Sequence, residues 1–337
     1  VHFQMEARFR EVEDLATVLT SATLEAIASS VKTDDLPEDE LAYFVFNPLN
    51  WNVTDLVRVT IDIDEDWLRA RGVQIHPDNI YRSVRNLRIR EWDGSPVDYH
   101  INNIEWMAQH RPWRPVFGPV WTVVRFTVEL AARDLPALGY KGYRIRLPLK
   151  EKRLDDRHGT GNPVRLENEH LAVEVRSDGT LRIVSKESGE EFPGGLHYFE
   201  DGGDNGDGYT YSPPRHDAIA TTLGGRVQMT RMADEKAVQA VAVDYTLDVP
   251  ESLTHDRQRR AQETVPMKIR SVFRLGPDSR RIDVETTLTN VAKDHRLRVC
   301  FAVPKAPANH HAEMQFDVVE RPNVVIQPDE EVWREDA

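Results

Sequence analysis

The stretch Val164–Phe192 reads VRLENEHLAVEVRSDGTLRIVSKESGEEF, and it decides the fold class. Apolar and polar residues alternate with a period of two over three short runs, as in strands that have one buried face. Asp178-Gly179 separates the second run from the third, and Asp-Gly is a strong signal for a tight hairpin turn. Ser188-Gly189 marks another turn after the third run. We therefore predict antiparallel strands joined by short turns.

The same alternation continues on both sides of this stretch. The runs that follow it are longer: Arg226–Met232, Ala237–Val249, Val265–Leu275, Arg280–Val291 and His295–Val303. They predict a large antiparallel sandwich. Between Tyr43 and Leu149, five to seven strands are separated by Gly, Pro, Asn and Asp, which is the pattern of a small β-sandwich. The fold class that we expect is therefore mainly β.

One segment departs from this pattern and predicts a helix. In Ala7–Val31, apolar residues recur at three- and four-residue spacing and form one stripe: Phe9, Val12, Leu15, Leu19, Ala22 and Ile27. A single helix has no core of its own. We expect the stripe to pack either on the β domains that follow or on helices that this chain does not contain.

Two polar segments divide the chain into three predicted domains. Thr33–Glu40 is an acidic linker, and Lys150–Gly161 is a charged linker that ends in glycine. We predict the end of a helical domain at 1–36, a small β-sandwich at 41–149 and a large β-sandwich at 162–337. The last ten residues are polar and contain no clear closing strand, so we expect the large sandwich to be incomplete.

The amino-acid composition limits the kinds of partner that the chain is expected to bind. The formal net charge of −13 repels phosphate backbones and anionic lipid surfaces, so we predict no nucleic-acid partner and no membrane. No apolar run approaches the length of a membrane span, and the start VHFQM lacks the pattern of a secretory signal; we expect a cytoplasmic protein. With Cys300 as the one cysteine, neither an internal disulfide nor a cysteine zinc site can form.

The segment Tyr198–Pro214, YFEDGGDNGDGYTYSPP, is the main candidate for a functional site, and we call it the Gly-Asp loop. Four interpretations are open: a calcium site, a catalytic acid pair, a substrate-binding loop or a solvated turn. An EF-hand starting at Asp201 fails, because Gly203 and Ser212 would occupy ligand positions. Aspartates and tyrosines on a loop that glycines allow to turn sharply would suit sugar hydroxyls.

Three other features are interpreted as structural. The basic run at 256–262, DRQRRAQ, is typical of a solvated loop. His216-Asp217 and His310-His311 are typical of surface histidines rather than metal ligands. Trp106, Trp113 and Trp121 could form a platform for a sugar, but packing across a loop is the more common use of tryptophan.

Several runs resemble the C-terminal half of bacterial α-mannosidases of glycoside hydrolase family 38. They match in order and spacing, and they are Phe46–Val57, Leu138–Ile145, Asn162–Phe192, Leu196–Pro214 and Asp294–Phe301. The resemblance implies three parts upstream of the large sandwich in the intact enzyme: a barrel with a zinc ion and an aspartate nucleophile, a three-helix bundle and a small sandwich. The large sandwich is galactose mutarotase-like in this family.

The resemblance also implies which residues would bind substrate. In the family this loop reaches towards the sugar pocket, and a tyrosine on it touches the substrate. Tyr209 is the best candidate and Tyr211 the second, with Asp204 and Asp207 shaping the loop. Two further candidates are the arginines of DHRLRV, Arg296 and Arg298, which alternation places on one side of their strand.

Two hypotheses of function follow. The first is a C-terminal fragment of a zinc-dependent retaining α-mannosidase, with α-mannosides as substrates and the barrel and helical domain as missing partners. On this hypothesis the chain carries no catalytic residue, binds no zinc itself and is inactive alone. The second is a carbohydrate-binding module or an interaction domain without catalysis.

Overall fold

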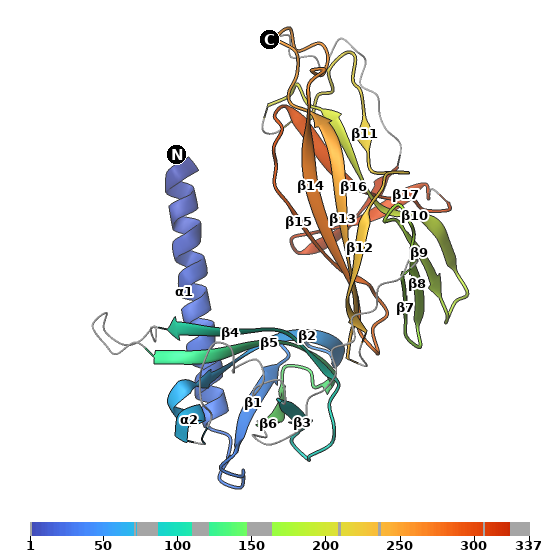
Figure 1. The fold of residues 1–337 in the computed structure, drawn as a ribbon. Coiled ribbons are helices and arrows are strands. Elements are labelled where there is room, and N and C mark those ends of the chain that lie inside the picture. Colours follow the sequence, from blue (N-terminus) through green and yellow to red (C-terminus); the bar gives the residue numbers. More distant parts are fainter. Residues whose placement is uncertain are drawn as a thin grey trace. The chain divides into compact units, whose positions relative to one another are not determined.

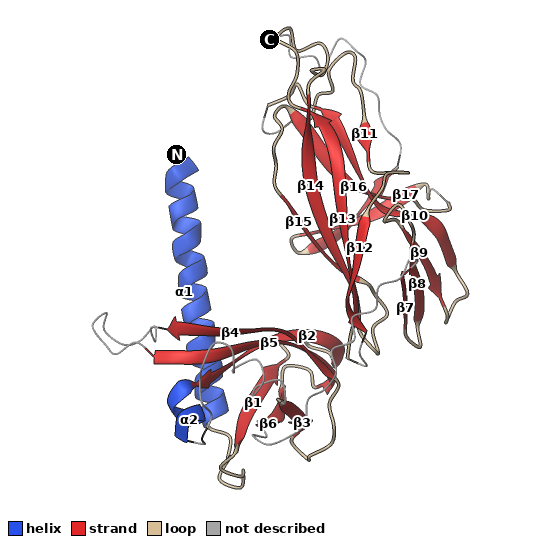
Figure 2. Ribbon diagram, viewed as in Figure 1, coloured by secondary structure: helices blue, strands red, loops and turns tan. Residues whose placement is uncertain are grey.

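The fold was analysed in a computed structural model, which describes residues 2–70, 72, 87–109, 121–146, 164–207, 210–234, 237–305 and 307–323. The chain forms two compact units. The first comprises Val1–Arg157, Glu235–Val238 and Gly276–Asp278, and the second comprises His158–Asp234, Gln239–Leu275 and Ser279–Ala337. Strands dominate the described residues of both units (Figure 2).

The predicted helix is present as α1, His2–Ser29, and Figure 1 shows it as one continuous helix. Its apolar stripe lies in solvent: the exposed fractions of Phe9, Leu15 and Leu19 are 65%, 58% and 58%. The described β strands therefore do not cover the stripe. Of the two packing partners that the sequence suggested, the β domains are thus not the one observed.

The first unit holds two three-stranded antiparallel sheets. One has the order β1-β6-β3, with bounds Glu40–Phe46, Tyr140–Arg146 and Arg88–Glu91. The other has the order β2-β5-β4, with bounds Val53–Asp64, Trp121–Leu135 and Tyr99–Gln109, and the short helix α2, Glu65–Ala70, follows β2. Phe126 of β5 and Tyr143 of β6 are fully buried in one shared core. The two sheets thus pack face to face as a small sandwich.

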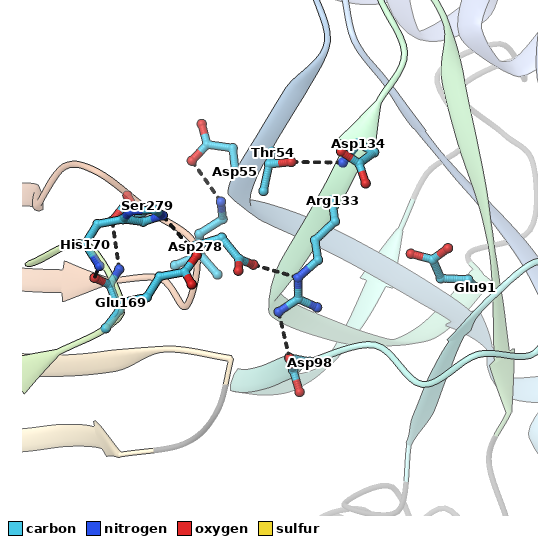
Figure 3. A network of polar contacts seen from close by, with 12 residues as sticks. Thr54, Asp55, Glu91, Asp98, Arg133, Asp134, Glu169, His170, Asp278 and Ser279 are labelled. Atoms are coloured by element: carbon cyan, nitrogen blue, oxygen red, sulfur yellow. Dashed lines mark hydrogen bonds and ion pairs between the residues drawn. The ribbon is translucent and has the colours of Figure 1, made fainter. Parts of the chain in front are cut away.

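A polar network on β5 braces this unit. The guanidinium of Arg133 donates to Asp278 Oδ2 at 2.6 Å and to Asp98 Oδ2 at 3.0 Å (Figure 3). Lys141 Nζ donates to the carbonyl oxygen of Arg133 at 2.9 Å and to Glu91 Oε1 at 2.8 Å. Because the acidic and basic groups satisfy one another, this network stabilises the unit and is not an open site.

The second unit is a larger sandwich. Its first sheet has the order β11-β10-β9-β8-β7, and β16 also pairs with β10; from β7 to β11 and then β16 the bounds are Val164–Glu167, Leu171–Val175, Leu181–Ser185, Glu191–Gly203, Ala220–Thr221 and His295–Phe301. Its second sheet has the order β12-β13-β14-β15, with bounds Gln228–Asp234, Gln239–Pro250, Thr264–Leu275 and Asp283–Leu288. Strands β17, Asn309–Met314, and β18, Asp317–Pro322, form a separate pair.

The core of this unit lies between the two sheets. Phe199 of β10 and Tyr245 of β13 are 3% and 2% exposed, and their ring centroids are 5.4 Å apart. His197 also points into this core, where its ring lies 4.8 Å from that of Phe273. Residues of both sheets thus share one apolar cluster, which defines a sandwich.

Both predicted hairpin turns of the opening stretch are confirmed. Gly179 joins β8 to β9 with φ +82°, and its amide donates to Arg176 O at 2.8 Å. A Cβ at Gly179 would lie 2.5 Å from the Tyr245 ring, so glycine is needed for space as well as for conformation. Gly189 joins β9 to β10 with φ +71°.

The predicted fold class, mainly β with two antiparallel sandwiches and one N-terminal helix, is confirmed. Within the described part of the chain, none of the helices has the length and the apolar content that crossing a membrane requires.

Candidate functional site

The segment Tyr198–Pro214 is only partly a loop. Its first residues, Tyr198–Gly203, complete β10 and pair with β16, so the prediction of a loop is wrong for them. The Gly-Asp loop itself follows Gly203, beside β16. The pairing register sets Gly203 opposite His295, Gly202 opposite Arg296 and Glu200 opposite Arg298. The run DHRLRV therefore lies next to the loop, although the run is about ninety positions further along the chain. Strand pairing thus brings together two of the segments that the sequence analysis had identified separately.

A buried ionic network holds the base of the loop. Asp201 is completely buried, and its two carboxylate oxygens contact Arg260 and His295. Arg260 Nη1 also donates to the carbonyl oxygens of Asp201 at 2.9 Å and Ala218 at 3.1 Å. His295 Nε2 lies 3.0 Å from Asn290 Oδ1. Each charged group is paired and hydrogen-bonded, which a buried charge requires.

This network corrects one interpretation made from the sequence. The run at 256–262 was interpreted as a solvated loop, and that is wrong for Arg260, which is 6% exposed. Its partner Asp201 is 59 positions away in the chain. No local pattern marks such a pair, because the network forms only when the loop, β16 and the segment before β14 meet.

Asp204 and Asp207 are engaged by the backbone of the loop itself. Asp204 Oδ1 accepts hydrogen bonds from the amides of Gly206 at 2.9 Å and Ser212 at 3.0 Å. Asp207 Oδ1 accepts one from the amide of Thr210 at 2.8 Å. These contacts are those of loop-shaping residues. Gly208 and the first candidate, Tyr209, lie outside the described residues.

Glycines are required where the loop closes on itself. A Cβ at Gly206 would lie 1.8 Å from the carbonyl oxygen of Thr210, and one at Gly203 would lie 2.8 Å from Pro214 Cγ. Asp217 fixes the loop from the other side, since its carboxylate accepts the Gly203 amide at 3.0 and 3.1 Å. The sequence analysis missed Asp217 as a loop anchor, because it had assigned His216-Asp217 to the surface.

Tyr211 and the two predicted arginines form a polar cluster beside the loop. The Arg296 guanidinium lies 4.3 Å from the centre of the Tyr211 ring, a cation–π contact. Arg298 pairs with Glu200 on the neighbouring strand. Burial and the nearby Asp217 carboxylate raise the pKa of Tyr211, while Arg296 and Arg298 oppose that rise. Tyr211 is therefore a neutral hydrogen-bonding group at pH 7, and it is 38% exposed.

The described residues do not fit a zinc ion. No group of three or more His, Cys, Asp or Glu side chains lies close enough there to hold a metal. Asp201 and His295 contact each other, and the Asp201 carboxylate also pairs with Arg260, so these groups are already engaged. His310 Nδ1 is 2.6 Å from Asn323 Oδ1. We therefore assign no metal ligand among the described residues.

The tryptophans that were considered as a sugar platform give no site in the described residues. Trp106 is 47% exposed, and its indole Nε1 donates to Glu65 Oε2 at 3.4 Å. Trp113 lies outside the described residues, and the side chain of Trp121 is not described. The cluster beside the Gly-Asp loop thus remains the stronger candidate.

Comparison with known families decides the membership of the chain. Residues 166–335 match the model of the glycosyl hydrolases family 38 C-terminal domain. The chain belongs to glycosyl hydrolase family 38. The matched region contains β10, the Gly-Asp loop and β16, so the whole candidate site lies inside the family domain. The resemblance stated from the sequence is confirmed.

Individual relatives agree with this membership. A protein of Halalkalibacterium halodurans that is provisionally named mannosylglycerate hydrolase is 24% identical over 96% of this chain. Two Enterococcus faecalis structures, an α-mannosidase and a protein in glycosyl hydrolase family 38, share the fold at 22% and 21% identity, each with a TM-score of 0.79 over 97% and 96% of this chain. The chain spans 38% of the first relative, and 38% and 40% of the two solved chains.

Proposed function

We propose that this chain is the C-terminal β part of a zinc-dependent retaining α-mannosidase and that its Gly-Asp loop contacts the mannoside. One observation carries the proposal: the family domain match at 166–335 includes a loop whose base is fixed by a buried ionic network. The names of the Halalkalibacterium relative and of the Enterococcus faecalis α-mannosidase support a mannoside as the substrate class.

The loop geometry suggests separate roles for the candidates. Asp204 and Asp207 accept backbone amides, so we assign them to loop shape. Tyr209 and Tyr211 would offer hydroxyl groups to the sugar, with Tyr209 as the first choice. Arg296 and Arg298 would supply donors from β16, and a guanidinium has several donors suited to hydroxyl and carboxylate oxygens.

The reaction itself requires groups that we place in other domains of the enzyme. A retaining glycosidase uses one carboxylate to attack the anomeric carbon and a second carboxyl group as acid and then base. The zinc ion would orient sugar hydroxyls. We propose that the N-terminal barrel supplies the nucleophile and the zinc ligands. The chain alone would then bind no zinc and catalyse no hydrolysis.

The exposed stripe of α1 supports a packing partner of the same enzyme. Phe9, Val12 and Leu15 are each more than half exposed on one helix face, a pattern that favours helix–helix packing. We propose that α1 completes a three-helix bundle, with domain limits at 1–36, 41–149 and 162–337. The location that we propose for the enzyme is the cytoplasm.

The experiment is a kinetic comparison in the complete enzyme that contains this region. We expect Arg296→Gln to lower kcat/KM for an aryl α-mannoside by about 10- to 100-fold, because a hydrogen bond from a charged group is lost. Tyr209→Phe should lower it by about 3- to 10-fold, because the hydrogen bond that it removes joins two neutral groups. Arg270→Gln is the matched control, since Arg270 pairs with Asp244 on an exposed strand face.

The outcome decides whether the Gly-Asp loop contacts the substrate or has a structural role. A loss of kcat/KM in both loop-side variants, with the control unchanged, supports substrate contact. Unchanged kinetics in both would contradict the proposal and leave a structural role for the loop. As a control, circular dichroism of each variant checks whether the fold is retained.

A further inference from the structure

We propose that Arg257 is a positioning residue, which sets the position of the Gly-Asp loop relative to the first residues of β16. One guanidinium reaches both segments. Arg257 Nε donates to Asn205 Oδ1 on the loop, and Arg257 Nη1 donates to Asp294 Oδ1, immediately before β16, at 3.3 Å. The inference rests on the proposed function, because it concerns the geometry of the site that would contact the mannoside.

The two segments joined in this way carry candidate substrate contacts. The loop carries Tyr211, six positions after Asn205. Strand β16 carries Arg296, two positions after Asp294. The Arg296 guanidinium lies 4.3 Å from the centre of the Tyr211 ring. A second link joins the backbones, since the Asp204 amide donates to the Asp294 carbonyl oxygen at 2.9 Å. Movement of the loop away from β16 would therefore separate the candidate groups.

The turn that presents Arg257 is itself held in place. The Arg257 amide donates to Thr254 O at 2.8 Å, and Thr254 Oγ1 donates to Asp256 Oδ1 at 2.6 Å. Three positions after Arg257, the guanidinium of Arg260 pairs with the buried Asp201 carboxylate at the base of the loop. Because these contacts fix the surrounding backbone, Arg257 can hold the loop rather than move with it.

Arg257 and Asp294 both have unusual backbone conformations. Their φ angles are +55° and +49°, a region that residues other than glycine seldom adopt. Such conformations cost free energy, persist where the surrounding contacts determine them and are enriched at functional sites. These two residues are also the two ends of the ion pair beside the loop. The strain therefore lies at the point where the loop and the strand are joined.

Arginine suits this role because its planar guanidinium carries five N–H donors in fixed directions. Here different nitrogens donate to an amide oxygen on one segment and to a carboxylate oxygen on the other. Lysine has one nitrogen at the end of a flexible chain, so Arg257→Lys keeps the charge near Asp294 but is less able to hold both partners. Arg257→Gln removes the charge as well. The two variants should therefore have graded effects.

The experiment compares Arg257→Gln with the matched control Arg259→Gln. Arg259 lies on the same turn, and its exposed side chain makes no hydrogen bond or ion pair within the described residues. In the whole chain, hydrogen exchange followed by mass spectrometry reports on the amides of Asn205, Gly206 and Ser212. We expect these amides to exchange about threefold faster or more in Arg257→Gln, less so in Arg257→Lys, and unchanged in Arg259→Gln.

The same variants are compared in the complete enzyme with an aryl α-mannoside. A loop that holds its binding-competent position for only part of the time binds substrate more weakly by that fraction. We expect Arg257→Gln to raise KM about 3- to 10-fold while kcat changes by less than about twofold, with partial recovery in Arg257→Lys. A purely structural role would lower the melting temperature and leave KM unchanged, so thermal unfolding is measured for each variant.

Arg296→Gln and Tyr209→Phe, measured in parallel, distinguish this inference from the proposed function. Faster exchange together with a higher KM in Arg257→Gln supports the positioning role. If Arg296→Gln lowers kcat/KM while Arg257→Gln matches Arg259→Gln in KM or in exchange, the positioning role is overturned and the proposed function stands. If Arg296→Gln and Tyr209→Phe both leave the kinetics unchanged, the substrate contact itself is contradicted, and the positioning role falls with it.

Discussion

Helix α1 and strand β13 show equally regular apolar patterns but differ completely in burial. On α1, Phe9 and Val12 are 65% and 64% exposed, whereas Val241 and Val243 of β13 are fully buried. The strand meets a second sheet within its own unit. The helix finds no such surface among the described residues. A periodic pattern therefore predicts which face of an element is apolar, and burial of that face needs a partner.

The largest expected effect comes from the buried side of this comparison. Phe273→Ala removes a fully buried ring from the core of the large sandwich. We expect it to lower the free energy of unfolding by about 3–5 kcal/mol, as large-to-small core substitutions do. Chemical denaturation followed by circular dichroism measures the change.

The matched substitution on the helix is Leu15→Ala, at a side chain that is 58% exposed. It should change the unfolding free energy of this chain by less than about 0.5 kcal/mol. A cost at Leu15 as large as that at Phe273 would break the comparison, because it would mean that the stripe is buried within this chain.

The second prediction contrasts a buried ion pair with an exposed one. Asp201→Asn leaves the Arg260 charge buried without its carboxylate partner, and we expect a loss of about 3–5 kcal/mol. Asp244→Asn breaks the ion pair between Asp244 and Arg270, whose side chains are 36% and 45% exposed, respectively. This change should lower the free energy of unfolding by about 0–1 kcal/mol. Thermal unfolding of the two variants tests the ranking. Equal costs would show that Asp201 is not an essential anchor of the loop.

The third prediction is that the stability of the large sandwich depends on pH, because His197 lies in its core. Burial lowers the pKa of His197 from 6.5 to about 4. The folded state therefore disfavours the charged imidazole, so stability is complete above pH 6.5 and falls as the pH decreases towards 4. The pKa difference corresponds to a loss of about 3 kcal/mol at most.

The control for His197 must keep its backbone conformation. Its φ is +62°, a region that asparagine tolerates better than most residues, so His197→Asn is the matched variant. Denaturation midpoints at pH 7 and pH 4.5 should differ less in this variant than in the unchanged protein. An identical pH dependence in both would show that His197 does not titrate against folding.

Local signals in the sequence were sufficient for most of the fold. The turn at Asp178-Gly179 and the alternation of Ala237–Val249 depend on neighbouring residues only, so both could be predicted. The pairing of β10 with β16, and the choice of β16 as the strand beside the loop, depend on contacts across about ninety positions. No short-range pattern contains that information.

The candidate site was predictable to a similar extent. Gly-Asp loop composition and family resemblance pointed to Tyr211, Arg296 and Arg298, and the structure brings these three residues close together. Their role in substrate binding stays a prediction. The anchors Asp201 and Arg260 could not be found, because each is an ordinary charged residue in sequence and becomes exceptional only through burial.

Hydrolysis of an aryl α-mannoside by the purified chain, with zinc added, tests the central claim most directly. If the nucleophile and the zinc ligands belong to other domains of the enzyme, the chain alone shows no turnover above the buffer rate, while the complete enzyme hydrolyses the substrate. Turnover by the isolated chain at the rate of the complete enzyme would contradict this account.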